Sequence, residues 1–268
     1  MLDHAVCKIL NDLYEKYNRR SFVEPDPLQF LYNYPDIRDR EIAGLVASSL
    51  AYGKVQQIVN SVAKVLERMP HPAEFLEQST RSGLVLEFHD FKHRFASGKD
   101  LSRLLWGAKR VMERYGSLGD CFRAGFREDD DTILPAAGLL VEEIHPIEHL
   151  LPLPARGSAC KRLFLFLRWM IRRDDVDPGG WDWVSPAKLI VPLDVHMHRL
   201  SRELGLTRRN QADLRTAREV TAAFREISPE DPVRYDFALT RLGIGNDASL
   251  EEFLQCIDRQ KRKREESR

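Results

Sequence analysis

The chain has 268 residues, of which 43% are hydrophobic and 31% are charged, and its 41 basic and 41 acidic side chains give a formal net charge of zero. This is an ordinary composition for a soluble globular protein, and the balanced charge excludes a global basic field that would attract nucleic acid. The sequence shows neither an apolar run long enough to span a membrane nor a signal-peptide pattern. We therefore expect a cytoplasmic protein with no membrane partner.

Apolar residues at helical spacing predict the first helices. One helix is expected over residues 2–18. The next runs from Ile37 to about Tyr52 and is apolar nearly all round, which is typical of a central helix. Asp36 can cap its start and Gly53 can end it. A clean stripe then predicts a third helix over residues 55–66.

The second half of the chain continues this pattern. Further helices are predicted over residues 101–116, 132–144, 161–173, 194–204 and 214–227. Asp231 and Pro232 supply a cap and a first-turn proline for a last long helix that reaches about Leu242. The basic segment 259–264 is expected to be a solvated helix end. Because no strand pattern or repeat appears, the sequence predicts an all-α fold of about ten to twelve helices.

Two polar residues stand at helix starts in unusual surroundings. Asp194 follows a proline-rich apolar run and directly precedes helix-forming sequence, so it is predicted to be an N-cap. Lys161 opens the helix after the turn-rich segment Leu153–Cys160, at a position where an ammonium group is usually disfavoured. Taken singly, a plain cap and a surface lysine are the ordinary roles for these two residues.

Together, the two segments resemble the helix-hairpin-helix (HhH-GPD) DNA glycosylase superfamily, in which a Gly/Pro hairpin with a lysine precedes a proline-rich loop with an aspartate. The segment Val191–Met197 is most similar to the 8-oxoguanine glycosylase branch. The blocks Gly157–Arg162 and Phe166–Met170 also resemble an uncharacterised bacterial family within or beside that superfamily. The hairpin departs from the usual spacing, since Lys161 lies eight residues after Leu153 instead of six.

The resemblance implies two helical lobes with a cleft between them. Residues 36–180 would form a middle lobe that ends in the hairpin and the Lys161 helix, while residues 1–35 and 181–268 would form a terminal lobe that carries Asp194. It further implies a DNA repair glycosylase with abasic-site lyase activity. Lys161 would form a Schiff base with the sugar, and Asp194 would stabilise the positive charge on it. Oxidised guanine is the first-choice substrate.

An enzyme of this kind flips the damaged base out of the duplex and must hold the distorted DNA. Candidates for contact with nucleic acid are Gly157, Ser158, Ala159, Arg162, His196 and Tyr52, with the hairpin N–H groups on phosphate and Tyr52 as a wedge in the duplex. His196 can equally be an ordinary polar helix residue, and Tyr52 can be a core residue. Asp236 resembles a base-reading acid, and its plain alternative is a solvent-facing helix charge.

We expect no cofactor, no bound metal and a monomer acting on DNA. The four cysteines are scattered, so they cannot form the closely spaced loop that holds an iron–sulfur cluster in some HhH-GPD glycosylases. Two other classes of protein remain open. The first alternative is a helical metal-dependent phosphohydrolase, because Asp194, His196 and His198, together with the pair His89–Asp90, are residue types that bind metal ions. On a helix, however, positions 194 and 198 share a face and position 196 does not. The second alternative is a non-catalytic nucleic-acid-binding protein with the same fold.

Overall fold

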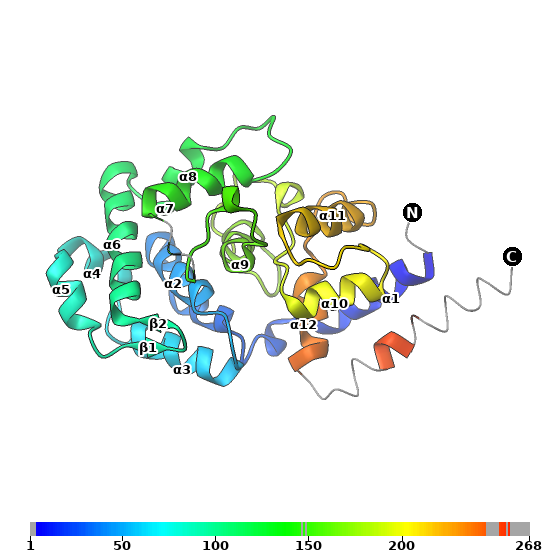
Figure 1. Ribbon diagram of the computed structural model, residues 1–268, viewed down its shortest axis with the longest axis horizontal. Coiled ribbons are helices and arrows are strands. Elements are labelled where there is room, and N and C mark those ends of the chain that lie inside the picture. The colour runs from blue at the N-terminus through cyan, green and yellow to red at the C-terminus, as the bar shows by residue number, and fades with distance from the viewer. Residues whose placement is uncertain (1–3, 146, 148, 245–251, 256, 258–268) are drawn as a thin grey trace, which may run out of the picture.

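The computed structural model describes residues 4–145, 147, 149–244, 252–255 and 257. The described chain is mostly helical, with one two-stranded hairpin, so the predicted all-α class is confirmed (Figure 1). The predicted basic helix end at 259–264 lies outside the described residues. No helix in the described part of the chain is both long and apolar enough to cross a bilayer.

The α-helices are α1 (His4–Tyr17), α2 (Ile37–Ser49), α3 (Val55–Leu66), α4 (Pro72–Gln78), α5 (Arg81–Glu87), α6 (Gly98–Tyr115), α7 (Leu118–Ala124), α8 (Leu134–Ile144), α9 (Lys161–Ile171), α10 (Val195–Glu203), α11 (Leu214–Arg225) and α12 (Asp236–Ile244). Short 3-10 helices are η1 (Arg20–Phe22), η2 (Pro27–Asn33), η3 (Pro154–Arg156) and η4 (Pro186–Lys188). The strands β1 (Lys92–His93) and β2 (Ala96–Ser97) pair antiparallel.

Local signals placed several helix ends correctly. The Asp36 carboxylate accepts hydrogen bonds from the N–H groups of Arg38 and Asp39, as expected of an N-cap. Asp194 caps α10 in the same way, and Gly205 follows that helix with a φ of +76°. A glycine adopts this left-handed conformation without steric cost, which ends the helix where the sequence predicts.

The predicted start of the last helix is wrong. Helix α12 begins at Asp236, and turns occupy residues 232–235. Asp231 does not serve as a cap: its Oδ2 accepts a hydrogen bond from Arg172 Nε at 2.9 Å, and its buried Oδ1 has no hydrogen-bond partner in the described chain. The seven-residue helices α4, α5 and α7 and the β1–β2 hairpin were not predicted, because segments this short carry too few residues to show a period.

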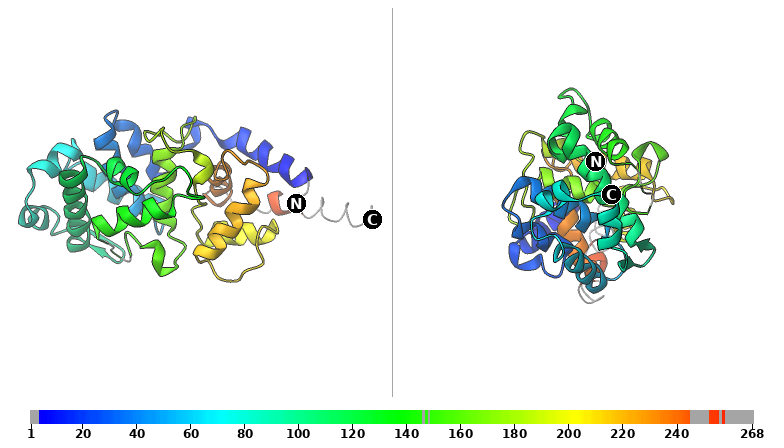
Figure 2. Two further views of the ribbon diagram at one scale, coloured as in Figure 1. Left: turned by 90° about the horizontal axis from the view of Figure 1, so that it is seen from above. Right: turned by 90° about the vertical axis from the view of Figure 1, so that its left-hand side faces the viewer.

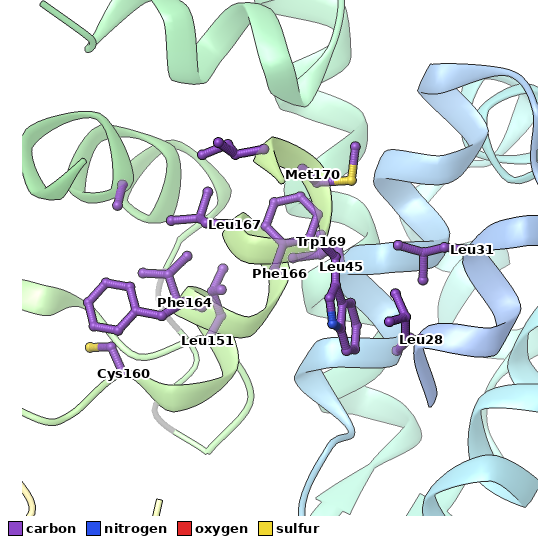
Figure 3. Packing of buried hydrophobic residues seen from close by; sticks show 14 of the residues in the cluster. Leu28, Leu31, Leu45, Leu151, Cys160, Phe164, Phe166, Leu167, Trp169 and Met170 are labelled. Carbon is purple, nitrogen blue, oxygen red and sulfur yellow. The ribbon is translucent and has the colours of Figure 1, made fainter. Parts of the chain in front are cut away.

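Helix α9 runs through the middle of the molecule and packs against α2 (Figure 1). Its apolar side chains point in several directions into the core, as predicted. In Figure 3, Phe164 lies beside Cys160 on one side of the helix, while Trp169 lies toward Leu28 and Leu31 on another. Because α9 is packed from several sides, its first residue is held rigidly.

The first and the last described α-helices lie at the same end of the molecule. In Figures 1 and 2, α3 to α6 lie at one end of the molecule, and α1, α10, α11 and α12 lie at the other. Helix α12 packs against both α1 and α10. The division into a lobe at 36–180 and a lobe at 1–35 plus 181–268 stays a prediction, since the buried hydrophobic residues form one continuous cluster through both segments.

Candidate active site

A cavity of about 930 Å³ lies where α9, α10, α12 and the turn between α2 and α3 meet. Seven of the nine predicted site residues line it: Tyr52, Ser158, Lys161, Arg162, Asp194, His196 and Asp236. Gly157 and Ala159 are not among its lining residues. The fold therefore brings side chains from four distant parts of the sequence to one cavity, whose volume suits a small-molecule or nucleotide ligand.

The Lys161 and Asp194 side chains meet in this cavity. Lys161 Nζ lies 3.5 Å from Asp194 Oδ2 and also donates a hydrogen bond to the Ala51 carbonyl at 3.2 Å. The two side chains are 30% and 34% exposed, so both are fixed by contacts yet open to a ligand. An amine and a carboxylate at this distance form an acid–base pair that can act on one substrate atom.

The backbone before α9 sets the position of Lys161. Cys160 adopts a left-handed conformation, with a φ of +47°, and its carbonyl accepts the first bond of the helix from the Phe164 N–H at 3.0 Å. Its thiol lies 3.3 Å from Ser158 Oγ. Because burial raises the pKa of the Cys160 thiol, this cysteine stays neutral beside the lysine.

The cap of α10 orients Asp194. Its Oδ1 accepts a hydrogen bond from the Met197 N–H at 2.8 Å, which leaves Oδ2 to face Lys161. Two residues on, His196 lines the cavity, and its buried Nε2 has no hydrogen-bond partner within the described chain. An unsatisfied buried nitrogen is costly, so a ligand that bonds to it would be favoured.

The side chains do not form the metal triad that the phosphohydrolase alternative requires. His198 is turned away from the cavity, with Nε2 at 3.0 Å from the Arg209 carbonyl. His89 contacts the Leu86 carbonyl through Nδ1, and Asp90 is paired with an arginine. Among the residues that the structure describes, no group of three or more His, Cys, Asp or Glu side chains is arranged to hold a metal ion.

Asp236 lies in the cavity wall with Arg168. Its carboxylate is ion-paired to Arg168 Nη1, while Arg168 also contacts Asp177 at 3.1 Å. Asp236 is only 3% exposed, so the alternative of a solvent-facing helix charge is wrong. Burial raises the pKa of Asp236 to about 6 despite the nearby guanidinium, and its buried Oδ1 has no hydrogen-bond partner in the described chain.

Sequence reasoning missed Arg168, although a signal was present. It is the lone charged residue in the otherwise apolar Leu163–Ile171 stretch of α9. Charged side chains are almost never fully buried without a partner. A buried arginine in that helix therefore requires a carboxylate from another segment, and Asp236 and Asp177 supply it.

Tyr52 and Arg162 form another wall. The Arg162 guanidinium lies 5.0 Å from the centroid of the Tyr52 ring. The Tyr52 hydroxyl donates to the His93 carbonyl at 2.9 Å, and burial raises its pKa. A wedge must project from the surface to enter a duplex, but the Tyr52 ring is held between these groups. The structure thus places Tyr52 in the cavity wall and not at a projecting tip.

The hairpin before Lys161 is held by backbone hydrogen bonds. The Gly157 N–H donates to the Pro154 carbonyl at 2.9 Å, so one of the three hairpin N–H groups is already engaged, and the phosphate contact of the hairpin stays a prediction. The Gly157 carbonyl accepts from the Leu214 N–H at 3.0 Å, which ties the hairpin to α11. Ala159 packs against the hydrophobic core. Ser158 is the residue of the three that reaches the cavity.

Comparison with known proteins assigns the chain to a family. No curated protein and no solved structure shows a significant match. The family model described as "Protein of unknown function (DUF2400)" matches residues 26–245, a segment that contains every residue lining the cavity. Because the match covers well over half of the 268 residues, the chain belongs to the DUF2400 family.

Proposed function

We propose that this protein is a DNA repair glycosylase with abasic-site lyase activity, of the helix-hairpin-helix type. It would act in the cytoplasm as a monomer, on DNA with one base flipped out and without a cofactor. The observation that carries the proposal is the pair formed by Lys161 Nζ and Asp194 Oδ2, 3.5 Å apart in a cavity of about 930 Å³.

The chemistry starts at the C1′–N bond of the damaged nucleotide. As the base leaves with the bonding electrons, positive charge develops on the sugar, and the Asp194 carboxylate stabilises it. Asp194 takes the proton that the Lys161 amine loses as Nζ bonds to C1′, and this proton passes to the departing base. Opening of the sugar ring then gives a Schiff base between Nζ and C1′. Transfer of a C2′ proton to a general base breaks the C3′–O bond and releases the 3′ phosphate strand, and hydrolysis of the Schiff base by water frees the Lys161 amine. Asp194 and the Ala51 carbonyl are the acceptors that contact Nζ in the described chain.

The remaining polar groups of the cavity would contact the flipped nucleotide. His196 Nε2 and Asp236 Oδ1 are buried and lack partners in the described chain, so each can form a hydrogen bond with a ligand at little desolvation cost. Asp236 would read a donor group on the base, and Ser158 and Arg162 would contact its phosphates. Oxidised guanine, which carries donor groups on its edge, is the first substrate to test.

Covalent trapping tests the role of Lys161. Borohydride reduces a Schiff base to a stable link, so the wild-type protein should become attached to an oligonucleotide that carries an abasic site. Lys161→Gln should abolish this product, because an amide cannot form the Schiff base. Asp194→Asn should slow base release by several orders of magnitude. Asparagine is also a good N-cap, so that variant keeps the start of α10.

Lys64→Gln is the matched control for the trapping experiment. Lys64 is an exposed lysine on α3 that does not line the cavity, so its loss should leave trapping unchanged. Wild-type trapping in Lys161→Gln would assign the nucleophile to another residue. Tight binding of lesion-bearing DNA without any base release would favour the non-catalytic nucleic-acid-binding alternative.

A further inference from the structure

The β1–β2 hairpin ends in an exposed aromatic side chain. His93 pairs with Ala96, so Arg94 and Phe95 form a two-residue turn between the strands. Phe95 is 76% exposed, whereas most large hydrophobic residues in the described chain are buried. A phenylalanine ring that stays in water adds no hydrophobic stabilisation to the folded state. Its exposure leaves the ring available to contact a partner.

The base of this hairpin is locked to the wall of the cavity. The buried His93 ring contacts Ser61 Oγ at 2.9 Å through Nδ1 and the Tyr52 carbonyl at 3.1 Å through Nε2. In return, the Tyr52 hydroxyl donates to the His93 carbonyl, and the two rings pack edge to face with centroids 4.8 Å apart. The hairpin also packs against α3 and α6 (Figure 1). These contacts hold the backbone that carries Phe95 in a fixed position.

The tip of the hairpin is next to the cavity. The Arg94 side chain lies across Gly53, where an added Cβ would meet Arg94 Cδ at 2.7 Å. Gly53 and the adjacent Tyr52 both line the cavity. The segment Lys92–Lys99 has three exposed basic residues and no acidic one, which favours a polyanion as the partner.

We propose that Phe95 is the residue that enters the duplex and stacks in the gap left by the flipped nucleotide. This inference rests on the proposed action on DNA and moves the wedge from Tyr52 to the hairpin tip. Removing a base from a stack leaves two exposed base faces, and an inserted apolar ring restores the stacking contacts. Arg94 and Lys92 would then lie against the flanking phosphates.

Leu86 provides the matched control because its side chain is about as exposed as that of Phe95 but does not lie at the tip of the hairpin. It is 73% exposed on α5, whereas Phe95 follows Arg94, whose side chain lies against the cavity-lining Gly53. Since single exposed apolar residues are common on protein surfaces, exposure alone does not identify a wedge. Removing the Leu86 side chain should leave DNA binding unchanged, and neither Phe95→Ala nor Leu86→Ala removes a buried contact.

The test uses duplexes that carry a tetrahydrofuran abasic analogue and a 2-aminopurine beside it. Wild-type protein should change the 2-aminopurine fluorescence, as a base that gains or loses a stacking partner does. Phe95→Ala should remove that change and weaken binding to this duplex about tenfold, from the loss of one base–aromatic contact. Phe95→Trp should restore both signals, while Leu86→Ala should match the wild type.

Single-stranded DNA with the same analogue separates a wedge from an ordinary strand contact. A single strand has no gap to fill, so Phe95→Ala should bind it as the wild type does. Equal losses on single and double strands, an unchanged Phe95→Ala on the duplex, or no binding by the wild type would each overturn the inference. The tetrahydrofuran analogue cannot form a Schiff base, so these results are independent of the Lys161 chemistry and of its trapping test.

Discussion

At the scale of single residues, the cavity contains buried polar groups that the described chain does not satisfy. His196 Nε2 and Asp236 Oδ1 are both buried and without a hydrogen-bond partner there. Native proteins rarely leave such atoms unpaired, because each costs about 1–3 kcal/mol of folding free energy. Both atoms lie in the cavity that holds Lys161 and Asp194, where a hydrogen bond from a ligand would recover that cost.

The raised pKa of Asp236 predicts a pH dependence of stability. Burial raises the pKa to about 6 from an ordinary 3.8, so the folded state holds the proton more tightly than the unfolded chain. The stability contributed by the protonated carboxyl is full below about pH 4 and is lost as the pH rises through 6. We expect the free energy of unfolding of the wild type, relative to Asp236→Asn, to fall by up to about 3 kcal/mol over this range.

Chemical denaturation of both proteins between pH 4 and pH 7 measures this difference. The variant is the proper reference because asparagine resembles the protonated carboxyl in shape and charge. A difference that instead grew with pH would mean that the ion pair with Arg168 holds Asp236 ionised in the folded state.

At the scale of the elements, helices α2 and α7 are joined by one carboxylate. Glu41, on α2, is buried and accepts hydrogen bonds from the N–H groups of Leu118 and Gly119 at 2.8 and 3.0 Å, at the start of α7. The Trp181 indole N–H donates to the same carboxylate at 2.8 Å. A carboxylate suits the positive end of a helix, so this contact fixes α7 against α2.

The packing around Glu41 leaves no room for a larger residue at position 119. A Cβ there would lie 2.7 Å from Glu41 Oε1 and 2.8 Å from Trp181 Nε1. Gly119→Ala should therefore lower the free energy of unfolding by about 1–3 kcal/mol, the usual cost of overpacking. Urea denaturation measures it directly.

Gly138 supplies the control of opposite sign. It lies inside α8, and no atom lies within 4 Å of its added Cβ beyond the local backbone. Gly138→Ala should raise the free energy of unfolding by about 0.5–1 kcal/mol, because alanine loses less backbone entropy in a helix. Equal effects of the two substitutions would show that the Glu41 contact does not constrain position 119.

At the scale of the whole molecule, an arginine at the end of α9 ties distant segments together. Arg172 contacts Asp174 at 2.7 Å and Asp231 at 2.9 Å, and it is also paired with Asp177. Asp174 in turn accepts a hydrogen bond from Asn18, just after α1. The contacts connect the central helix to the segments at both ends of the chain, behind the wall that holds Asp236.

Removing this buried cation should destabilise the protein strongly. Arg172→Ala leaves buried carboxylates without their partner, and we expect a loss of about 3–5 kcal/mol in the free energy of unfolding. The neighbouring Arg173 pairs with Asp182 in solvent, with both side chains largely exposed. Arg173→Ala should cost less than about 1 kcal/mol. Thermal or urea unfolding of the two variants measures both losses of stability. Similar losses of unfolding free energy in the two variants would contradict the assigned role of Arg172.

The sequence by itself determined the fold class and much of the local structure. Helical stripes, the caps at Asp36 and Asp194 and the stop at Gly205 were readable because each depends on residues within a few positions along the chain. The same locality explains the misplaced start of α12. Asp231 has the sequence of a cap, but its carboxylate is engaged by Arg172, fifty-nine residues away.

Only the tertiary structure decided which residues share the candidate site. Lys161 and Asp194 were chosen from sequence by resemblance, but their distance of 3.5 Å follows from how α9 and α10 pack. The burial of Asp236 depends on Arg168, and the position of Phe95 depends on the anchor between His93 and Tyr52. Such contacts join segments far apart in the chain. A local pattern can show that a buried arginine such as Arg168 needs a partner, but it does not give the partner or the distance, because long-range packing sets both.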